Sequence, residues 1–348
     1  MQIVLTGATG FVASHLIPKL KAAGHKIRTL GRRPVNNLAF TKWDTSEEPE
    51  ADVFESADAV IHLAGETVAQ RWTDESKKRI RSSRVDGTRH LVDAMSKAAK
   101  RPSSLPGKAA FIQDLRPAAI RIPSAWNTPG VSGYLVSGVA RAGSLGELTA
   151  RKSKGVLLCA SAVGFYGSRG DEILTESSAR GSGFLADVTD GWEEAARGAE
   201  AFGIRVVHLR FGVILGADGG AFPKILQPFR FGAGGRLGSG KQWMPWVHVE
   251  DAVALIVFAL ENARLHGAVN VTSPQPVTNA DFTHALGAVL DRPTLMTVPE
   301  FGLKLALGEM ADAVLSSERA VPAAAEAAGF HFAFPELEPA LRDLTHQG

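Results

Sequence analysis

The sequence predicts an α/β protein with a doubly wound parallel sheet, followed by a smaller, mainly helical cap part. Short apolar runs alternate with helical patterns up to about residue 215, the order that gives right-handed crossovers and parallel strands. A glycine-rich turn joins the first run to the first helical pattern, and from about residue 216 the chain becomes glycine-rich and then mainly helical. We therefore expect an α/β domain over 1–215 and a second part over 216–348.

The expected strands and helices follow one another at short intervals. The strands are expected at Gln2–Leu5, His25–Leu30, Ala59–Leu63, Gly155–Ala160, Val206–Leu209 and Ala268–Val271. The helices are expected at Phe11–Ala23, Asp74–Lys100, Val247–Glu261, Ala280–Leu290 and, with an interruption at Pro322, Phe301–Ala328. The late strand and helix, at about 245–272, should pack back on the first domain.

The stretch at about 102–153 interrupts this order. It is rich in Pro, Gly, Ser and Ala, and its acidic residues are only Asp114 and Glu147. Removing it would join a finished helix directly to the strand at Gly155, the short connection that such sheets favour. We interpret it as an insertion on the rim of the sheet, and both a functional lid and a segment without fixed structure stay open.

Composition and charge exclude several classes of protein. The 38 basic and 36 acidic residues give a net charge of +2, which predicts no nucleic-acid partner. The single Cys159 excludes an internal disulfide, and ten scattered histidines favour no metal site. No apolar run reaches the roughly 18–20 residues of a membrane span, and the first residues do not resemble a signal peptide. We expect a cytoplasmic protein whose partner is a small molecule, with no membrane partner and with the oligomeric state open.

The first turn carries the clearest functional signal. Gly7-Ala8-Thr9-Gly10-Phe11-Val12-Ala13 has the form GxxGxxA and lies between a strand and a helix. Small residues there let the backbone turn sharply and bring a pyrophosphate against the free N–H groups and positive end of the helix. The sequence thus predicts a Rossmann-type nucleotide site with Gly7, Thr9, Gly10, Phe11 and Val12 among its ligand-binding residues.

The end of the second strand discriminates between the two nicotinamide cofactors. An NAD site normally has an acidic residue there, which binds the ribose hydroxyls. This chain has Arg32 and Arg33, whose guanidinium groups suit a 2′-phosphate. The pattern favours NADP(H) over NAD(H).

Five further motifs accompany the turn in a fixed order. They read HLAGE at 62–66, VDGT at 85–88, SAVGFYG at 161–167, WVHVED at 246–251 and, near the end of the chain, RAVP at 319–322. This ordered set resembles the extended short-chain dehydrogenase/reductase family, in its epimerase-type (NAD-dependent epimerase/dehydratase-like) subgroup with an added C-terminal domain. The resemblance implies that Leu63, Ala64, Gly65 and Glu66 run along the cofactor.

The resemblance also implies a catalytic Tyr-xxx-Lys pair, which is not found where it is expected. Its helix should lie within Phe184–Glu200, which has neither residue, and the expected catalytic hydroxyl falls on Ala162. We take Ser161 and Tyr166 as the remaining catalytic candidates, because they follow the strand that should face the nicotinamide. Two other departures are Arg84, where the family often has Asn, and Met244, where sugar-nucleotide enzymes often have Arg.

Three functions stay open at this point. The first is an NADP(H)-dependent oxidoreductase or epimerase with an altered catalytic apparatus and an unidentified substrate. The second is an NADP(H)-binding sensor or regulatory protein without turnover, which the loss of both catalytic residues would explain. The third is a sugar-nucleotide epimerase, which requires the residues that are absent.

Overall fold

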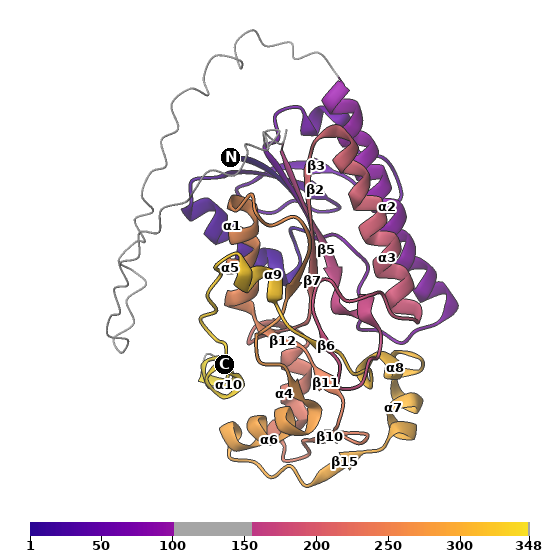
Figure 1. Ribbon diagram of the computed structural model, residues 1–348, viewed down its shortest axis with the longest axis vertical. Helices are drawn as coiled ribbons and strands as arrows, with labels where there is room; N and C mark the ends of the chain where they lie inside the picture. Colours follow the sequence, from indigo (N-terminus) through magenta and orange to yellow (C-terminus); the bar gives the residue numbers. More distant parts are fainter. Residues whose placement is uncertain (101–154, 347–348) are drawn as a thin grey trace, which may run out of the picture. The chain divides into compact units, whose positions relative to one another are not determined.

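A seven-stranded parallel sheet forms the centre of the protein (Figure 1). The computed structural model describes residues 1–100 and 155–346. In spatial order the strands are β13 (Gly267–Val271), β7 (Arg205–Phe211), β5 (Val156–Ala162), β4 (Ala59–His62), β1 (Gln2–Thr6), β2 (Lys26–Gly31) and β3 (Ala39–Lys42). The order reverses direction at β1, so β2 and β3 lie on one side of it and the later strands on the other. A crevice at such a reversal is where doubly wound sheets bind dinucleotides.

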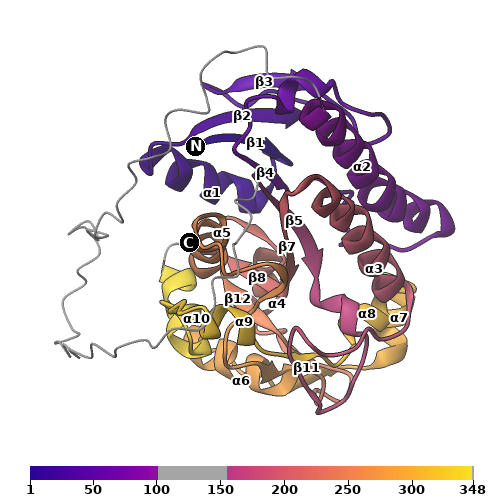
Figure 2. The same ribbon diagram turned by 45° about the horizontal axis from the view of Figure 1, so that its top comes forward.

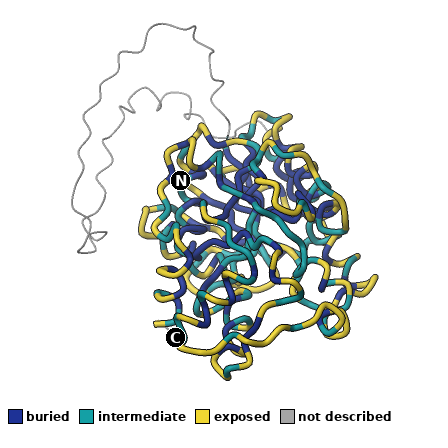
Figure 3. The backbone as a smooth tube through the Cα atoms, turned by 60° about the horizontal axis from the view of Figure 1, so that its bottom comes forward, coloured by how far each residue is buried: buried dark blue, intermediate teal, exposed yellow. Residues whose placement is uncertain are grey.

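Helices cover both faces of this sheet (Figure 2). α1 (Phe11–Ala22) and α5 (Val249–Glu261) pack on one face, and α2 (Asp74–Lys100) and α3 (Phe184–Arg197) pack on the other. Short 3-10 turns lie at Ala51–Phe54, Val163–Tyr166 and Gly198–Phe202. Most residues of β1, β4, β5, β7 and β13 are buried between the two helix layers, whereas no residue of β3 at the edge is buried (Figure 3). The predicted fold class is confirmed.

Most of the chain after β7 forms short strands and helices. The strands are β8 (Val213–Gly216), β9 (Gly219–Gly220), β10 (Gly235–Leu237), β11 (Trp243–Met244), β12 (Trp246–His248), β14 (Val277–Thr278), β15 (Met296–Val298) and β16 (Arg319–Ala320), which pairs with β6 (Ile173–Leu174). The helices are α4 (Phe222–Arg230), α6 (Asn279–Leu290), α7 (Glu300–Leu307), α8 (Met310–Val314), α9 (Ala323–Ala327) and α10 (Leu337–His346). α4, α6 and α10 share an apolar core of their own. This part belongs to the same compact unit as the sheet, so the boundary at 215/216 stays a prediction.

The WVHVED motif ties the end of the chain to the sheet. His248 caps α5, since its Nδ1 accepts a hydrogen bond from the Glu250 amide at 3.2 Å. The Asp251 carboxylate accepts hydrogen bonds from the backbone amides of Ala333 and Phe334 at 2.8 and 2.9 Å. The motif therefore has a structural role, because it fixes where the C-terminal segment crosses α5.

The structure corrects two expectations and leaves one outside its range. The short strand β3 was not predicted from the sequence. The helical stretch expected over Phe301–Ala328 has the expected interruption at Pro322, before α9, but it is also divided into α7 and α8, because the φ of 62° at Gly308 is outside the helical region and ends α7. The expected insertion at about 102–153 lies outside the described residues.

Candidate functional site

The predicted phosphate loop has the geometry that anion binding requires. Gly7 has a φ of 69°, and a Cβ placed on it would lie 2.6 Å from the carbonyl carbon of Leu63. A side chain at this position would collide with the backbone of the β4 loop. Gly10 is the N-cap of α1 and has no side chain to cap it, which leaves the first amides of the helix available. These features fit a pyrophosphate held by backbone N–H groups.

A buried network fixes the loop after β1 against the loop after β4. The hydroxyl oxygen of Thr6 accepts hydrogen bonds from the amides of Leu63 and Ala64, both at 3.2 Å. The ring of His62 lies between the hydroxyls of Thr6 and Thr88, at 2.7 and 3.0 Å. Burial, with a smaller contribution from the charge of Arg84, lowers the pKa of His62 to about 3. His62 is therefore a neutral structural link at physiological pH.

A cavity of about 1050 Å³ lies over the carboxyl ends of β1, β2, β3 and β4. Its lining includes the predicted residues Gly7, Thr9, Gly10, Arg32, Arg33, Leu63, Ala64, Gly65 and Glu66. Arg32 and Arg33 are exposed, and among the described residues neither has an ion pair or a side-chain hydrogen bond. Their donors are thus free for a ligand phosphate.

Sequence reasoning missed part of this cavity. Trp43, Asp44, Thr45 and Ser46 line it directly after β3, and α2 adds Arg79, Ser82, Ser83, Asp86 and His90. Had β3 been predicted, the residues that follow it could have been assigned to the cavity, because the carboxyl ends of parallel strands share one edge of a sheet. β3 has only four residues and none of them is buried, so no apolar run marks it.

A second cavity of about 420 Å³ lies on the other side of the phosphate loop, over β4, β5 and β7. It shares Gly7, Gly10, Leu63, Gly65 and Glu66 with the first, and Phe11, Val12 and Ser161 also line it. α3 contributes Leu185, Val188, Thr189 and Trp192, of which Leu185 and Thr189 are separated by four positions on the face that meets this cavity. A Tyr-xxx-Lys pair would have this spacing. The Thr189 hydroxyl donates to the carbonyl oxygen of Leu185 at 2.7 Å, so its proton is used within the helix.

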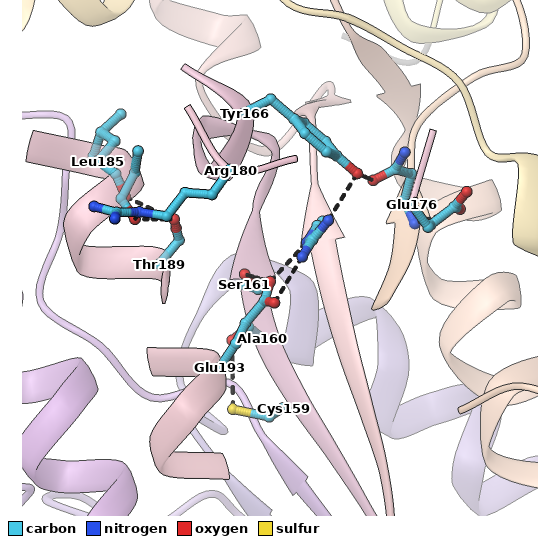
Figure 4. A network of polar contacts seen from close by, with 12 residues as sticks. Cys159, Ala160, Ser161, Tyr166, Glu176, Arg180, Leu185, Thr189 and Glu193 are labelled. Carbon is cyan, nitrogen blue, oxygen red and sulfur yellow. Dashed lines mark hydrogen bonds and ion pairs between the residues drawn. The ribbon is translucent and has the colours of Figure 1, made fainter. Parts of the chain in front are cut away.

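The two catalytic candidates belong to one buried polar network (Figure 4). Ser161 donates a hydrogen bond to Oε1 of Glu193 at 2.7 Å. Tyr166 is fully buried, does not line either cavity described here, and donates to Oδ1 of Asn270 at 2.7 Å. Its oxygen accepts a hydrogen bond from Nη1 of Arg210 at 3.0 Å. The structure thus brings Ser161 to the second cavity and places Tyr166 behind it, because the turn after β5 directs the phenol toward β13.

Arg210 and Glu193 are the charged centre of this network. Nε and Nη2 of Arg210 donate to the two carboxylate oxygens of Glu193 at 2.7 and 2.8 Å, and their side chains are only 5% and 2% exposed. Burial raises the pKa of Glu193, but the hydrogen bonds and charge of Arg210 lower it by more, so the net direction is downward. The Arg210 guanidinium also stacks on Phe165, 3.6 Å from the ring centroid. Glu193 is therefore an ionised carboxylate that accepts the hydrogen bond of Ser161 and holds its hydroxyl in place.

The part of the chain that the structure describes shows no metal centre and no membrane span. Nowhere in 1–100 or 155–346 do three or more His, Cys, Asp or Glu side chains meet in a metal-binding arrangement. Over the same residues, no helix is both long enough and apolar enough to cross a bilayer. Cys159 is fully buried, and burial raises the pKa of its thiol.

The fold and the paired cavities define a dinucleotide-binding α/β protein. The chain belongs to the NAD dependent epimerase/dehydratase family, whose profile matches residues 3–111 and 134–272. Residues 298–344 match a second family, a domain of unknown function called DUF1731. The resemblance that the sequence motifs indicated is confirmed.

Similar proteins cover the whole chain. The epimerase family protein YfhF of Bacillus subtilis is 34% identical over 349 residues, which cover 99% of this chain and 98% of that protein. The chloroplastic SDR39U1 homolog of Arabidopsis thaliana is also 34% identical, over 99% of this chain and 86% of its own. Among solved structures, human epimerase family protein SDR39U1 (isoform 2), crystallised with NADPH, has a TM-score of 0.76 and 27% identity, with 100% of both chains covered.

Proposed function

We propose that the chain is an NADP(H)-binding epimerase or oxidoreductase of the extended short-chain dehydrogenase/reductase type, with an atypical active site and a small-molecule substrate. The observation that carries the proposal is the combination of a phosphate loop with two unpaired arginines in the same cavity. The NADPH in the human relative supports this choice of cofactor. NAD(H) is less favoured because no carboxylate follows Arg32 and Arg33 directly at the end of β2.

Titration of the purified protein with NADPH and NADH tests the cofactor. Replacing both Arg32 and Arg33 by Ala should weaken NADPH binding roughly ten- to a hundredfold, because losing the charge-assisted contact with the 2′-phosphate costs about 1.5–3 kcal/mol in total. NADH binding should change little. The control is Arg28→Ala, an exposed arginine on the same strand that lies outside the cavity. Equal loss for both nucleotides, or no loss, would contradict the assignment.

For turnover, the bound nicotinamide would supply or accept the hydride. Within the chain, Ser161 is our candidate for proton transfer because, unlike Tyr166, it lines the second cavity; its hydroxyl donates to Glu193 in this structure and would have to turn to the reacting oxygen. Tyr166 is assigned a positioning role, because its proton is directed to Asn270 and it holds Arg210 in place. Ser161→Ala should therefore reduce turnover while leaving NADPH binding unchanged.

A non-catalytic NADP(H)-binding sensor is the second candidate. Leu185 and Thr189 favour it, because the cavity-facing positions of α3 carry no phenol and no ammonium. Loss of the reduced-nicotinamide absorbance during incubation with pools of carbonyl compounds would exclude this candidate. Binding without any redox change across such pools, and across alcohols with NADP⁺, would favour it. A sugar-nucleotide epimerase is the least favoured candidate, because it requires the Tyr-xxx-Lys pair that α3 lacks.

A further inference from the structure

Arg84 is a cation at the wall of the second cavity. It lies on α2, and its Nη1 donates to the carbonyl oxygens of Glu66 and Ile80 at 2.9 and 3.2 Å. A Cβ placed on Gly65 would lie 3.2 Å from Cζ of Arg84, and on another side the guanidinium lies 5.0 Å from the ring centroid of Trp192. The guanidinium is thus held in one position between the β4 loop and α3.

The charge of Arg84 lacks a counter-ion. Within the described ranges, no carboxylate lies within 4.0 Å of its guanidinium, and Nε and Nη2 have no hydrogen-bond partner in the protein. Burial lowers the pKa of Arg84 to about 10, and the more distant charge of Glu66 offsets only part of this effect. A partly buried charge without a counter-ion is costly, so a ligand oxygen that accepts from it would be bound favourably.

The position of this cation relative to the two cavities indicates which ligand oxygen it meets. The first cavity holds Arg32 and Arg33 over β2 and β3, and the phosphate loop separates it from the second. A dinucleotide spans such a sheet with one nucleotide on each side of the reversal in strand order. The half that carries the nicotinamide therefore falls in the second cavity, with Arg84.

We propose that Arg84 is the positioning residue for the nicotinamide half, and that its guanidinium binds the ribose oxygens there. This inference rests on the proposed NADP(H) function. Leu185 and Thr189 of α3 line the cavity, and neither carries a positive charge. The fixed positive charge comes instead from Arg84 on α2, and not from a lysine on α3 as in the expected Tyr-xxx-Lys pair. The planar guanidinium offers two donors at a fixed angle, which suits two neighbouring hydroxyl oxygens.

The test compares two probes that share the 2′-phosphate and the adenosine. NADPH carries the nicotinamide half, whereas adenosine 2′,5′-bisphosphate does not. Arg84→Met should weaken NADPH binding roughly tenfold or more and leave the affinity for the bisphosphate unchanged within about twofold. Arg84→Lys should restore much of the NADPH affinity because it keeps the charge. Arg81→Met, on the exposed face of the same helix, should change neither affinity.

The outcomes separate this inference from the proposed function. If Arg84→Met weakens both probes equally, or neither, the positioning role is wrong while the cofactor assignment stands. If wild type binds neither probe, the cofactor assignment itself is wrong. Arg84→Gln serves as a second uncharged variant that can still donate to the carbonyl oxygen of Glu66. The same selective loss for NADPH in both uncharged variants, with rescue by Lys, supports the inference.

Discussion

Replacing Glu193 by Gln should destabilise the protein strongly. The substitution keeps the shape of the side chain but removes the negative charge that Arg210 binds through two hydrogen bonds of 2.7 and 2.8 Å. Arg210 would remain 4% exposed without a counter-ion. Breaking a buried ion pair in this way costs about 3–5 kcal/mol. A folded protein has a free energy of unfolding of about 5–15 kcal/mol, so this loss is a large fraction of the total.

Urea unfolding followed by tryptophan fluorescence measures this loss. Glu194→Gln is the matched control, because Glu194 is the next residue on α3 and its exposed pair with Arg197 should contribute at most about 1 kcal/mol. Combining Glu193→Leu with Arg210→Met should recover part of the stability, since both charges are then removed. If Glu193→Gln costs no more than the control, the account of the buried pair is refuted.

Two further predictions concern the loops at the sheet edge. Gly7→Ala should abolish nucleotide binding and lower stability, because the new Cβ would lie 2.6 Å from the backbone of Leu63; unchanged titration and melting curves would contradict this. His62 has a folded pKa of about 3 against 6.5 for the free side chain, so below pH 6.5 the unfolded state binds more protons. Stability should therefore be unaffected by His62 above pH 6.5 and should fall between pH 6.5 and 3, by up to about 1.4 kcal/mol per pH unit. An NMR titration of the His62 ring with a midpoint near 6 would disprove this.

Local sequence patterns were sufficient to predict six of the seven strands of the sheet and the phosphate loop. The apolar run of β1 and the spacing of Gly7 and Gly10 between a strand and a helix are visible in neighbouring positions of the sequence, although the backbone that excludes a side chain at Gly7 belongs to Leu63, far away in the chain. The same applies to Arg32 and Arg33, which directly follow β2. Each of these patterns is made of residues that are close together in the chain.

The remainder of the site depends on residues that are far apart in the chain. Tyr166 seemed available for proton transfer, but its hydroxyl meets Asn270, 104 positions away. Arg84 was noted only as a departure from a family pattern, and its position beside Gly65 and Trp192 required the fold. The pairing of Arg210 with Glu193 joins a strand to a helix and has no local signature.

The strand order has a consequence for the synthesis of the chain. β7 lies between β5 and β13, and β13 is the last strand of the sheet to leave the ribosome. Until Gly267–Val271 emerges, β7 has an open edge with unpaired backbone groups, which favours pairing with other chains. Translation at about 5–20 residues per second leaves that edge open for several seconds. A nascent chain stalled between Phe211 and Gly267 should therefore be prone to aggregate and should bind chaperones.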